Sequence, residues 1–182
     1  MELELLEMRK TVRHGYQVLL KIEAEICLPT EAPKIRAFYQ DLAEACLNWA
    51  QNGYGEQLKN EFSALESNKE RAQFRAQKYQ LRMRKCFENQ DYIALLCESA
   101  LMGRWSGAWD GYRRISHVWN KAEELLLPQA QILRAFGFRL SGKDLPFHPD
   151  GIYPEGDSLV LFRNANERYG FLEKKFLFKK ES

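Results

Sequence analysis

The chain has 182 residues and a formal net charge of +2, with 45% hydrophobic and 29% charged residues. These values are typical of one globular domain with a substantial core, and they exclude disordered and fibrous classes. The small net charge gives no overall field that would favour nucleic acid or an acidic membrane. We therefore expect a single domain over residues 1–182.

The N-terminal segment carries acids where a secretory signal peptide needs positive charge, and no apolar run reaches the roughly 20 residues of a membrane span. We expect a soluble, cytoplasmic protein. The four cysteines, Cys27, Cys46, Cys86 and Cys97, lack the spacing of a metal or redox motif. We expect buried thiols, with a Cys86–Cys97 disulfide across a predicted hairpin as the alternative.

The first predicted elements are a strand and a helix. Residues 2–12 fit neither the strand nor the helix period. Apolar residues then alternate from Val18 to Leu28, which predicts a half-buried strand that ends at Pro29. A helix over 31–50 follows, capped by Thr30, with an apolar stripe at three- and four-residue spacing. Glycines at 53 and 55 predict its end, and a shorter helical continuation extends to about residue 65.

A three-stranded antiparallel meander over Tyr79–Trp119 organises the rest of the chain. Its middle run, 92–102, is apolar at successive positions and predicts a central strand covered on both faces. Residues 125–128 and 132–136 look like short helical pieces, and 137–157 look irregular. Strands at 158–162 and 171–178 close the chain. The predicted fold class is α+β, an antiparallel sheet of meander plus terminal strands with one long amphipathic helix packed on a face.

The loop between the second and third meander strands is the best candidate binding site. Arg104, Trp105, Trp109 and Asp110 bring large aromatics and both charge signs onto a glycine-rich loop. Trp and Arg are the residue types that anchor binding hot spots. The structural alternative is that the tryptophans fold back and cap the core.

A basic cluster in the first meander strand offers a second hypothesis, nucleic-acid binding through residues 75–85. Its members are Arg75, Lys78, Arg82, Arg84 and Lys85. Aromatic residues alternate with these cations, so they project from opposite faces of the strand, whereas a stacking platform needs them on one face. A solvated sheet face, or a sheet edge guarded by charge, is the favoured explanation of the cluster, and nucleic acid is the less favoured partner.

Catalytic patterns are weak in this sequence. His14, His117 and His148 have no neighbour at metal-ligand spacing, so we expect no metal and no cofactor. A Cys97–His117 dyad would need an exposed thiol of low pKa, yet Cys97 stands in the most apolar run. The carboxylate pairs Glu123–Glu124 and Glu98–Asp110 read as solvated side chains. An enzyme, such as a hydrolase of cell-wall or peptide substrates with an unrecognised site, ranks third.

The order of elements resembles one bacterial domain of unknown function. That domain forms the outward end of lysozyme-sensing anti-sigma factors and accompanies some peptidoglycan deacetylases. The run Ser106-Gly107-Ala108-Trp109 stands where the family has a Gly-Gly-Ala-His-type turn, and 120–133 and 150–162 resemble its Leu-rich stretch and late hairpin. The resemblance implies a non-catalytic α+β module that binds a protein or a small ligand. Ser106 and Trp109 depart from the family turn, so lysozyme binding is not implied.

Overall fold

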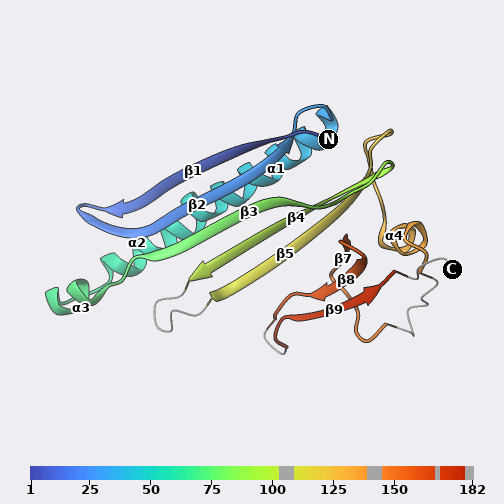
Figure 1. Cartoon of the computed structure of the whole chain (residues 1–182). Helices are drawn as coiled ribbons and strands as arrows, with labels where there is room; N and C mark the ends of the chain where they lie inside the picture. Colours follow the sequence, from blue (N-terminus) through green and yellow to red (C-terminus); the bar gives the residue numbers. More distant parts are fainter. Residues whose placement is uncertain (103–108, 139–144, 167–168, 179–182) are drawn as a thin grey trace.

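The computed structural model describes residues 1–102, 109–138, 145–166 and 169–178 and shows two antiparallel-rich sheets with a long helix (Figure 1). The large sheet has the order β1-β2-β3-β4-β5-β6, and the small sheet has the order β7-β8-β9. The large sheet comprises β1 (Leu3–His14), β2 (Gln17–Pro29), β3 (Gln77–Glu88), β4 (Tyr92–Met102), β5 (Trp109–Asn120) and β6 (Leu125–Leu126). The small sheet comprises β7 (Gly151–Glu155), β8 (Ser158–Arg163) and β9 (Leu172–Leu177). The predicted α+β class, the strand before Pro29 and the meander are confirmed.

The pairing of β2 with β3 differs from that of every other neighbouring pair in the described sheets, because these two strands run parallel. The helical segment connects them, since a parallel pair needs a long crossover. This arrangement places the β1–β2 hairpin beside the β3–β4–β5 meander in one continuous sheet.

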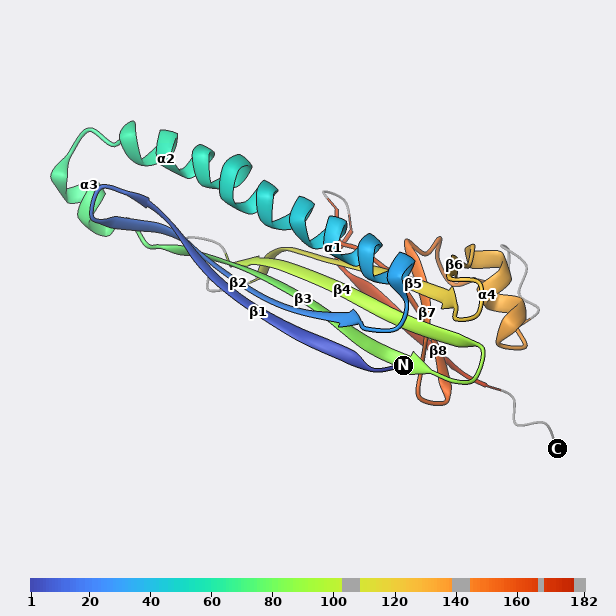
Figure 2. The same cartoon turned by 90° about the horizontal axis from the view of Figure 1, so that it is seen from above.

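The helical layer covers one face of the large sheet (Figure 2). Helix α1 (Pro33–Asn48) continues through a π-helical segment, η1 (Trp49–Tyr54), into α2 (Gly55–Ser63), and α3 (Asn68–Gln73) follows. The predicted stop at the glycines is therefore wrong. A Cβ at Gly55 would lie 2.9 Å from the Val12 side chain, so this glycine permits close packing of the helix on β1 rather than ending it.

The N-terminus of α1 is capped from a distant loop. Thr30, the predicted cap, instead donates its hydroxyl hydrogen bond to the carbonyl of Glu2. The Glu124 carboxylate accepts hydrogen bonds from the backbone N–H groups of Lys34 at 2.7 Å and Ile35 at 3.3 Å. Free N–H groups at a helix start attract a carboxylate, so this contact fixes α1 against the β5–β6 connection. The expectation of a solvated Glu124 is thereby corrected.

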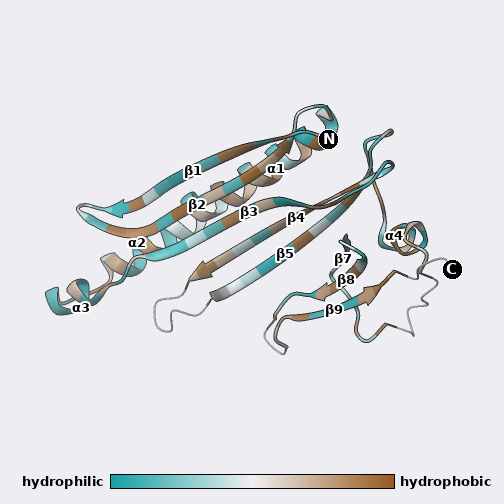
Figure 3. Ribbon diagram, viewed as in Figure 1, coloured by the Kyte–Doolittle hydropathy of each residue, from teal (hydrophilic) through white to brown (hydrophobic). Residues whose placement is uncertain are grey.

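Two hydrophobic cores lie on opposite faces of the large sheet. The first joins the sheet to α1 and α2 and includes Ile22, Tyr39, Leu58 and Leu95. The second joins β4 and β5 to the small sheet and includes Leu96, Val118 and Phe162 among its members. Alternate residues of β4 enter different cores, which confirms a central strand covered on both faces. The hydropathy colouring in Figure 3 shows the corresponding alternation along the long strands.

The C-terminal third departs most from expectation. Strands β8 and β9 confirm the predicted closing pair, but β7 lies in the segment predicted to be irregular. β7 is an edge strand, where the missing N–H of Pro154 is tolerated. Of the two predicted helical pieces, 125–126 pairs with β5 as β6, and helix α4 spans Gln129–Ala135. Among the described residues, no helix is long and apolar enough to cross a membrane.

Candidate functional site

The predicted binding loop falls mostly beyond what the structure describes. Arg104 and Trp105 lie outside the described residues. The backbones of Trp109 and Asp110 begin β5, where they pair with Met102 and Leu101, and their side chains also lie outside the described part. The loop's role therefore stays a prediction, and the described chain on its two sides belongs to β4 and β5.

A pocket with a volume of about 330 Å³ lies on the sheet face that the helices leave uncovered. The strands β2 to β5 supply its walls, and its Ser99, Ala100 and Tyr112 are close in sequence to the ends of the predicted loop. The lining residues are Glu23, Glu25, Gln80, Leu81, Arg82, Glu98, Ser99, Ala100 and Tyr112. The structure thus shows a hollow that sequence reasoning did not identify, next to the loop that it did.

The strand register creates a row of alternating charge across this face. Glu25 stands opposite Arg82, which stands opposite Glu98, which stands opposite Arg114. Opposite charges at directly facing positions stabilise neighbouring strands. At the β2–β3 contact, Arg82 Nε donates to Glu25 Oε2 at 2.9 Å, and Lys78 Nζ lies 2.8 Å from Glu23 Oε2. The pocket floor therefore holds ionised groups of both signs at fixed spacing.

Glu98 is the most embedded of the pocket carboxylates. Tyr112 donates its hydroxyl to Glu98 Oε1 at 2.5 Å, and Arg114 and Arg84 lie at 3.2 and 3.3 Å from its two oxygens. Partial burial acts to raise the pKa of Glu98, but these donors and cations outweigh burial and hold it below the ordinary value. Burial, together with Glu98, raises the pKa of Tyr112 to about 12. Glu98 is therefore a carboxylate at neutral pH, and Tyr112 keeps its proton.

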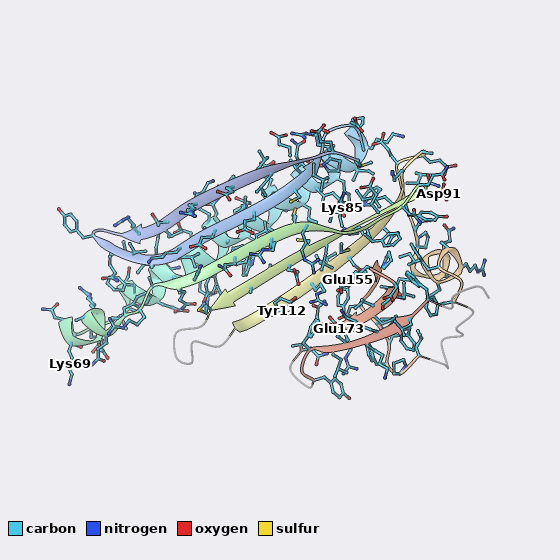
Figure 4. The ribbon with its side chains drawn as sticks, viewed as in Figure 1. Lys69, Lys85, Asp91, Tyr112, Glu155 and Glu173 are labelled. Carbon is cyan, nitrogen blue, oxygen red and sulfur yellow. The ribbon has the colours of Figure 1, made fainter. Side chains whose placement is uncertain are left out.

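Arg114 joins this row to the small sheet. Figure 4 labels Tyr112 on β5 and Glu173 on β9, which lie on the two sides of this junction. Its guanidinium forms ion pairs with Glu98 and Glu173, and it donates to the Tyr153 hydroxyl at 3.2 Å. Four aromatic rings surround it at 5.0–5.9 Å from ring centroid to Cζ, a cation–π distance. The rings belong to Tyr112, Tyr153, Phe162 and Phe171. Its side chain is only 11% exposed. Arg114 therefore has a structural role, which is to hold the small sheet against the large sheet.

The basic cluster of β3 is neutralised by neighbouring carboxylates. Besides the Lys78 and Arg82 pairs, Arg84 lies 3.6 Å from Glu155, and Lys85 lies 2.7 Å from Glu88. These ion pairs explain the cluster as part of the charged sheet face.

His117 belongs to a buried polar cluster beneath α1. Trp119 Nε1 donates to the Tyr39 hydroxyl at 3.2 Å, and that hydroxyl lies 3.0 Å from His117 Nδ1. The Tyr39 hydroxyl and His117 Nδ1 share one hydrogen bond, and the imidazole tautomer sets which of the two donates. Burial lowers the pKa of His117 to about 4.

The cysteines do not form the arrangements weighed from the sequence. Cys97 belongs to the core under the helices, whereas Cys86 packs against the core beneath the small sheet, so the two point away from each other. Cys97 instead contacts Cys46 of α1, and that contact, together with burial, raises the pKa of the Cys97 thiol. A thiol with a raised pKa is a poor nucleophile, which argues against a Cys97–His117 dyad. Within the described ranges, no group of three His, Cys, Asp or Glu residues could hold a metal ion.

The comparisons with known proteins identify the fold. No protein-family model matches the sequence, and no curated protein matches it significantly. A DUF3298 family protein from Pseudomonas aeruginosa PAO1 has 12% identity and a TM-score of 0.57, covering 97% of this chain and 90% of that chain. A DUF3298 family member from Bacteroides fragilis NCTC 9343 has 10% identity and a TM-score of 0.60, covering 98% and 90%. The chain is therefore similar in fold to bacterial DUF3298 domains, a family of unknown function.

Proposed function

We propose that this protein is a non-catalytic binding module, which holds a protein segment or small ligand in the pocket on the uncovered sheet face. The observation that carries the proposal is the pocket itself, because it lies at the hairpin end that also bears the predicted loop of Arg104, Trp105, Trp109 and Asp110. Its volume of about 330 Å³ is within the range of small-ligand sites.

The charges of the pocket indicate the chemistry of the ligand. Glu25 and Arg82 are 51% and 60% exposed, so their ion pair contributes little to stability and can be exchanged at low cost. An ammonium or guanidinium group would replace Arg82 beside Glu25, and a carboxylate would replace Glu25 beside Arg82. A peptide segment carries both kinds of group, and the loop tryptophans would add apolar contact area.

The resemblance to the outward domain of anti-sigma factors agrees with this proposal, because a sensor of that kind acts by contacting another protein. The bacterial DUF3298 domains of similar fold are likewise of unknown function. We extend the proposal no further toward a named partner.

The proposal is tested by capture of a partner from the lysate of the native host. We expect wild type to retain a protein that both a Glu25→Ala/Arg82→Ala variant and a Trp105→Ala/Trp109→Ala variant lose, while circular dichroism shows both variants folded. The matched control is Glu56→Ala/Lys59→Ala, which removes another solvent-accessible ion pair on α2. Equal capture by wild type and both test variants would contradict the proposal.

A further inference from the structure

The outer edge of β1 is a long strand edge with no partner in the described chain. β1 is the first strand in the order of the large sheet and pairs only with β2. Figure 1 shows it as the outermost strand. Edge strands invite pairing with another chain unless they are short, bulged, covered or guarded by charged side chains, and β1 carries charges of both signs. β1 has 12 residues, and its only register shift falls near its end, between Val12 and Arg13.

The hydrogen-bond pattern shows which backbone groups of β1 point outward. The Thr30 N–H donates to the Glu2 carbonyl at 3.1 Å, and these two residues continue the register in which Leu3 faces Pro29. Bonded and non-bonded pairs alternate along an antiparallel ladder. Even-numbered residues therefore bond to β2, and the odd-numbered residues Leu5, Glu7 and Arg9 direct their N–H and C=O groups away from the sheet.

The side chains of this edge are suited to a second copy of the same strand. The acids Glu4 and Glu7 come first in β1, and the cations Arg9 and Lys10 follow, so an antiparallel copy brings opposite charges together. If Met8 of one copy faces Met8 of the other on a two-fold axis, Glu7 of each copy faces Arg9 of the other, which gives two opposite-charge contacts. Shifting by two residues in either direction brings Glu7 against Glu7 or Arg9 against Arg9, which is unfavourable. Glu7 stands opposite Glu25 of β2, a like charge, and Arg9 stands opposite Glu23 and helps to lower the pKa of that carboxyl, but neither Glu7 nor Arg9 forms an ion pair within 4.0 Å among the described residues.

An apolar groove beside this edge adds a place for the copy's side chains. It has a volume of about 380 Å³ and lies between β1 and α1. Leu6 and Met8 line it from the strand, and Ala43 and Leu47 line it from the helix. Leu6 is 39% exposed and Leu5, on the opposite face, is 56% exposed. Pairing would cover both leucines and place apolar side chains of the copy over the groove.

We propose that β1 pairs antiparallel with β1 of a second copy of this chain, centred on Met8, so that the two large sheets form one continuous sheet. This inference does not rest on the ligand proposed above, because β1 does not line the pocket, although Glu7 and Arg9 face the pocket residues Glu25 and Glu23 across the β1–β2 pair. The outward N–H and C=O groups of Leu5, Glu7 and Arg9 supply the pairing, and the Glu7–Arg9 contacts set the register.

The experiment is sedimentation velocity on the full chain with a charge reversal at each of the two positions. We expect wild type to be a dimer, and Glu7→Arg and Arg9→Glu each to be a monomer, because each reversal puts like charges opposite each other at both symmetric contacts. Mixing the two variants should restore a dimer, since opposite charges then meet at both contacts. Glu66→Arg and Lys69→Glu, at exposed positions far from β1 in sequence, should remain dimers.

Amide hydrogen exchange gives a second, residue-specific measurement. In the dimer, the N–H groups of Leu5, Glu7 and Arg9 should be protected, and the protection should disappear in the Glu7→Arg variant while the N–H groups of β2 stay protected. The proposal is overturned if wild type is a monomer at every soluble concentration, if both single reversals remain dimers, or if the mixture stays monomeric. Exposed outward amides in a wild-type dimer would also overturn it.

Discussion

At the scale of single residues, His117 gives the protein a defined response to acid. Its pKa falls from the ordinary 6.5 to about 4 because the imidazole is buried against Tyr39 and Phe38. Below pH 6.5 the His117 imidazole is protonated in the unfolded chain, whereas it stays neutral in the folded protein until the pH approaches 4. Stability therefore declines as pH falls from about 6.5 toward 4, by up to about 3 kcal/mol.

The measurement is urea unfolding between pH 7 and 5.5, a window above the ordinary pKa values of carboxylates. We expect the free energy of unfolding of wild type to fall across this window and that of His117→Gln to change much less. His14→Gln, at the exposed end of β1, serves as the control for the loss of a histidine. Parallel slopes for wild type and His117→Gln would exclude this role.

At the scale of elements, the Glu124 contact links the start of α1 to the loop after β5. Replacing the carboxylate with an amide removes the charge that faces the helix N-terminus, so Glu124→Gln should lower the free energy of unfolding by about 1 kcal/mol. The neighbouring exposed Glu123→Gln has no such contact and should be neutral. Equal unfolding midpoints for the two variants in chemical denaturation would refute the capping role.

Sequence patterns predicted an element well where one face of it is uniformly buried, so that apolar and polar residues alternate regularly. Strand β2 has one face buried in the core, and its alternation was clear. β1 was ambiguous because it is an edge strand, with Leu5 and Leu6 left exposed. Gly55 was misread as a helix end because a glycine required by packing looks the same in sequence as one that ends a helix. The short β7 carries a glycine and a proline among its five residues, which hid it.

The pocket could not be predicted from the sequence, because it depends on how distant strands pair. Glu25 and Arg82 face each other only because β2 and β3 pair in a parallel register across 57 residues. No local pattern determines that register. The charged residues of β3 were visible in the sequence, but the carboxylates that neutralise them come from β2, β4 and the small sheet.

At the scale of the whole molecule, Arg114 couples the two sheets. Replacing it with methionine keeps much of the apolar stem but leaves the mostly buried Glu98 and the exposed Glu173 without their shared cation. Loss of one partner of a buried ion pair typically costs about 3–5 kcal/mol. Arg114→Met should destabilise by about 3 kcal/mol, whereas Arg113→Met, at the adjacent exposed position, should change stability little.

The same variant tests whether the chain folds as one unit, as we propose for residues 1–182. In wild type, near- and far-ultraviolet circular dichroism should report one coincident unfolding transition. The reason is that both hydrophobic cores contain side chains of β4 and β5. In Arg114→Met, we expect the transitions to separate as the small sheet detaches first. Two separate transitions in wild type would contradict the single unit.

The parallel contact between β2 and β3 also has a kinetic consequence. The β1–β2 hairpin and the β3–β4–β5 meander are built from local antiparallel contacts, which form quickly once the chain collapses. Joining them requires closing a chain segment of 57 residues that includes the entire helical layer. We therefore expect the association of these two halves to be the slow step of folding. Until it occurs, β2 and β3 each remain an open strand edge, and in this interval the chain is most prone to aggregate.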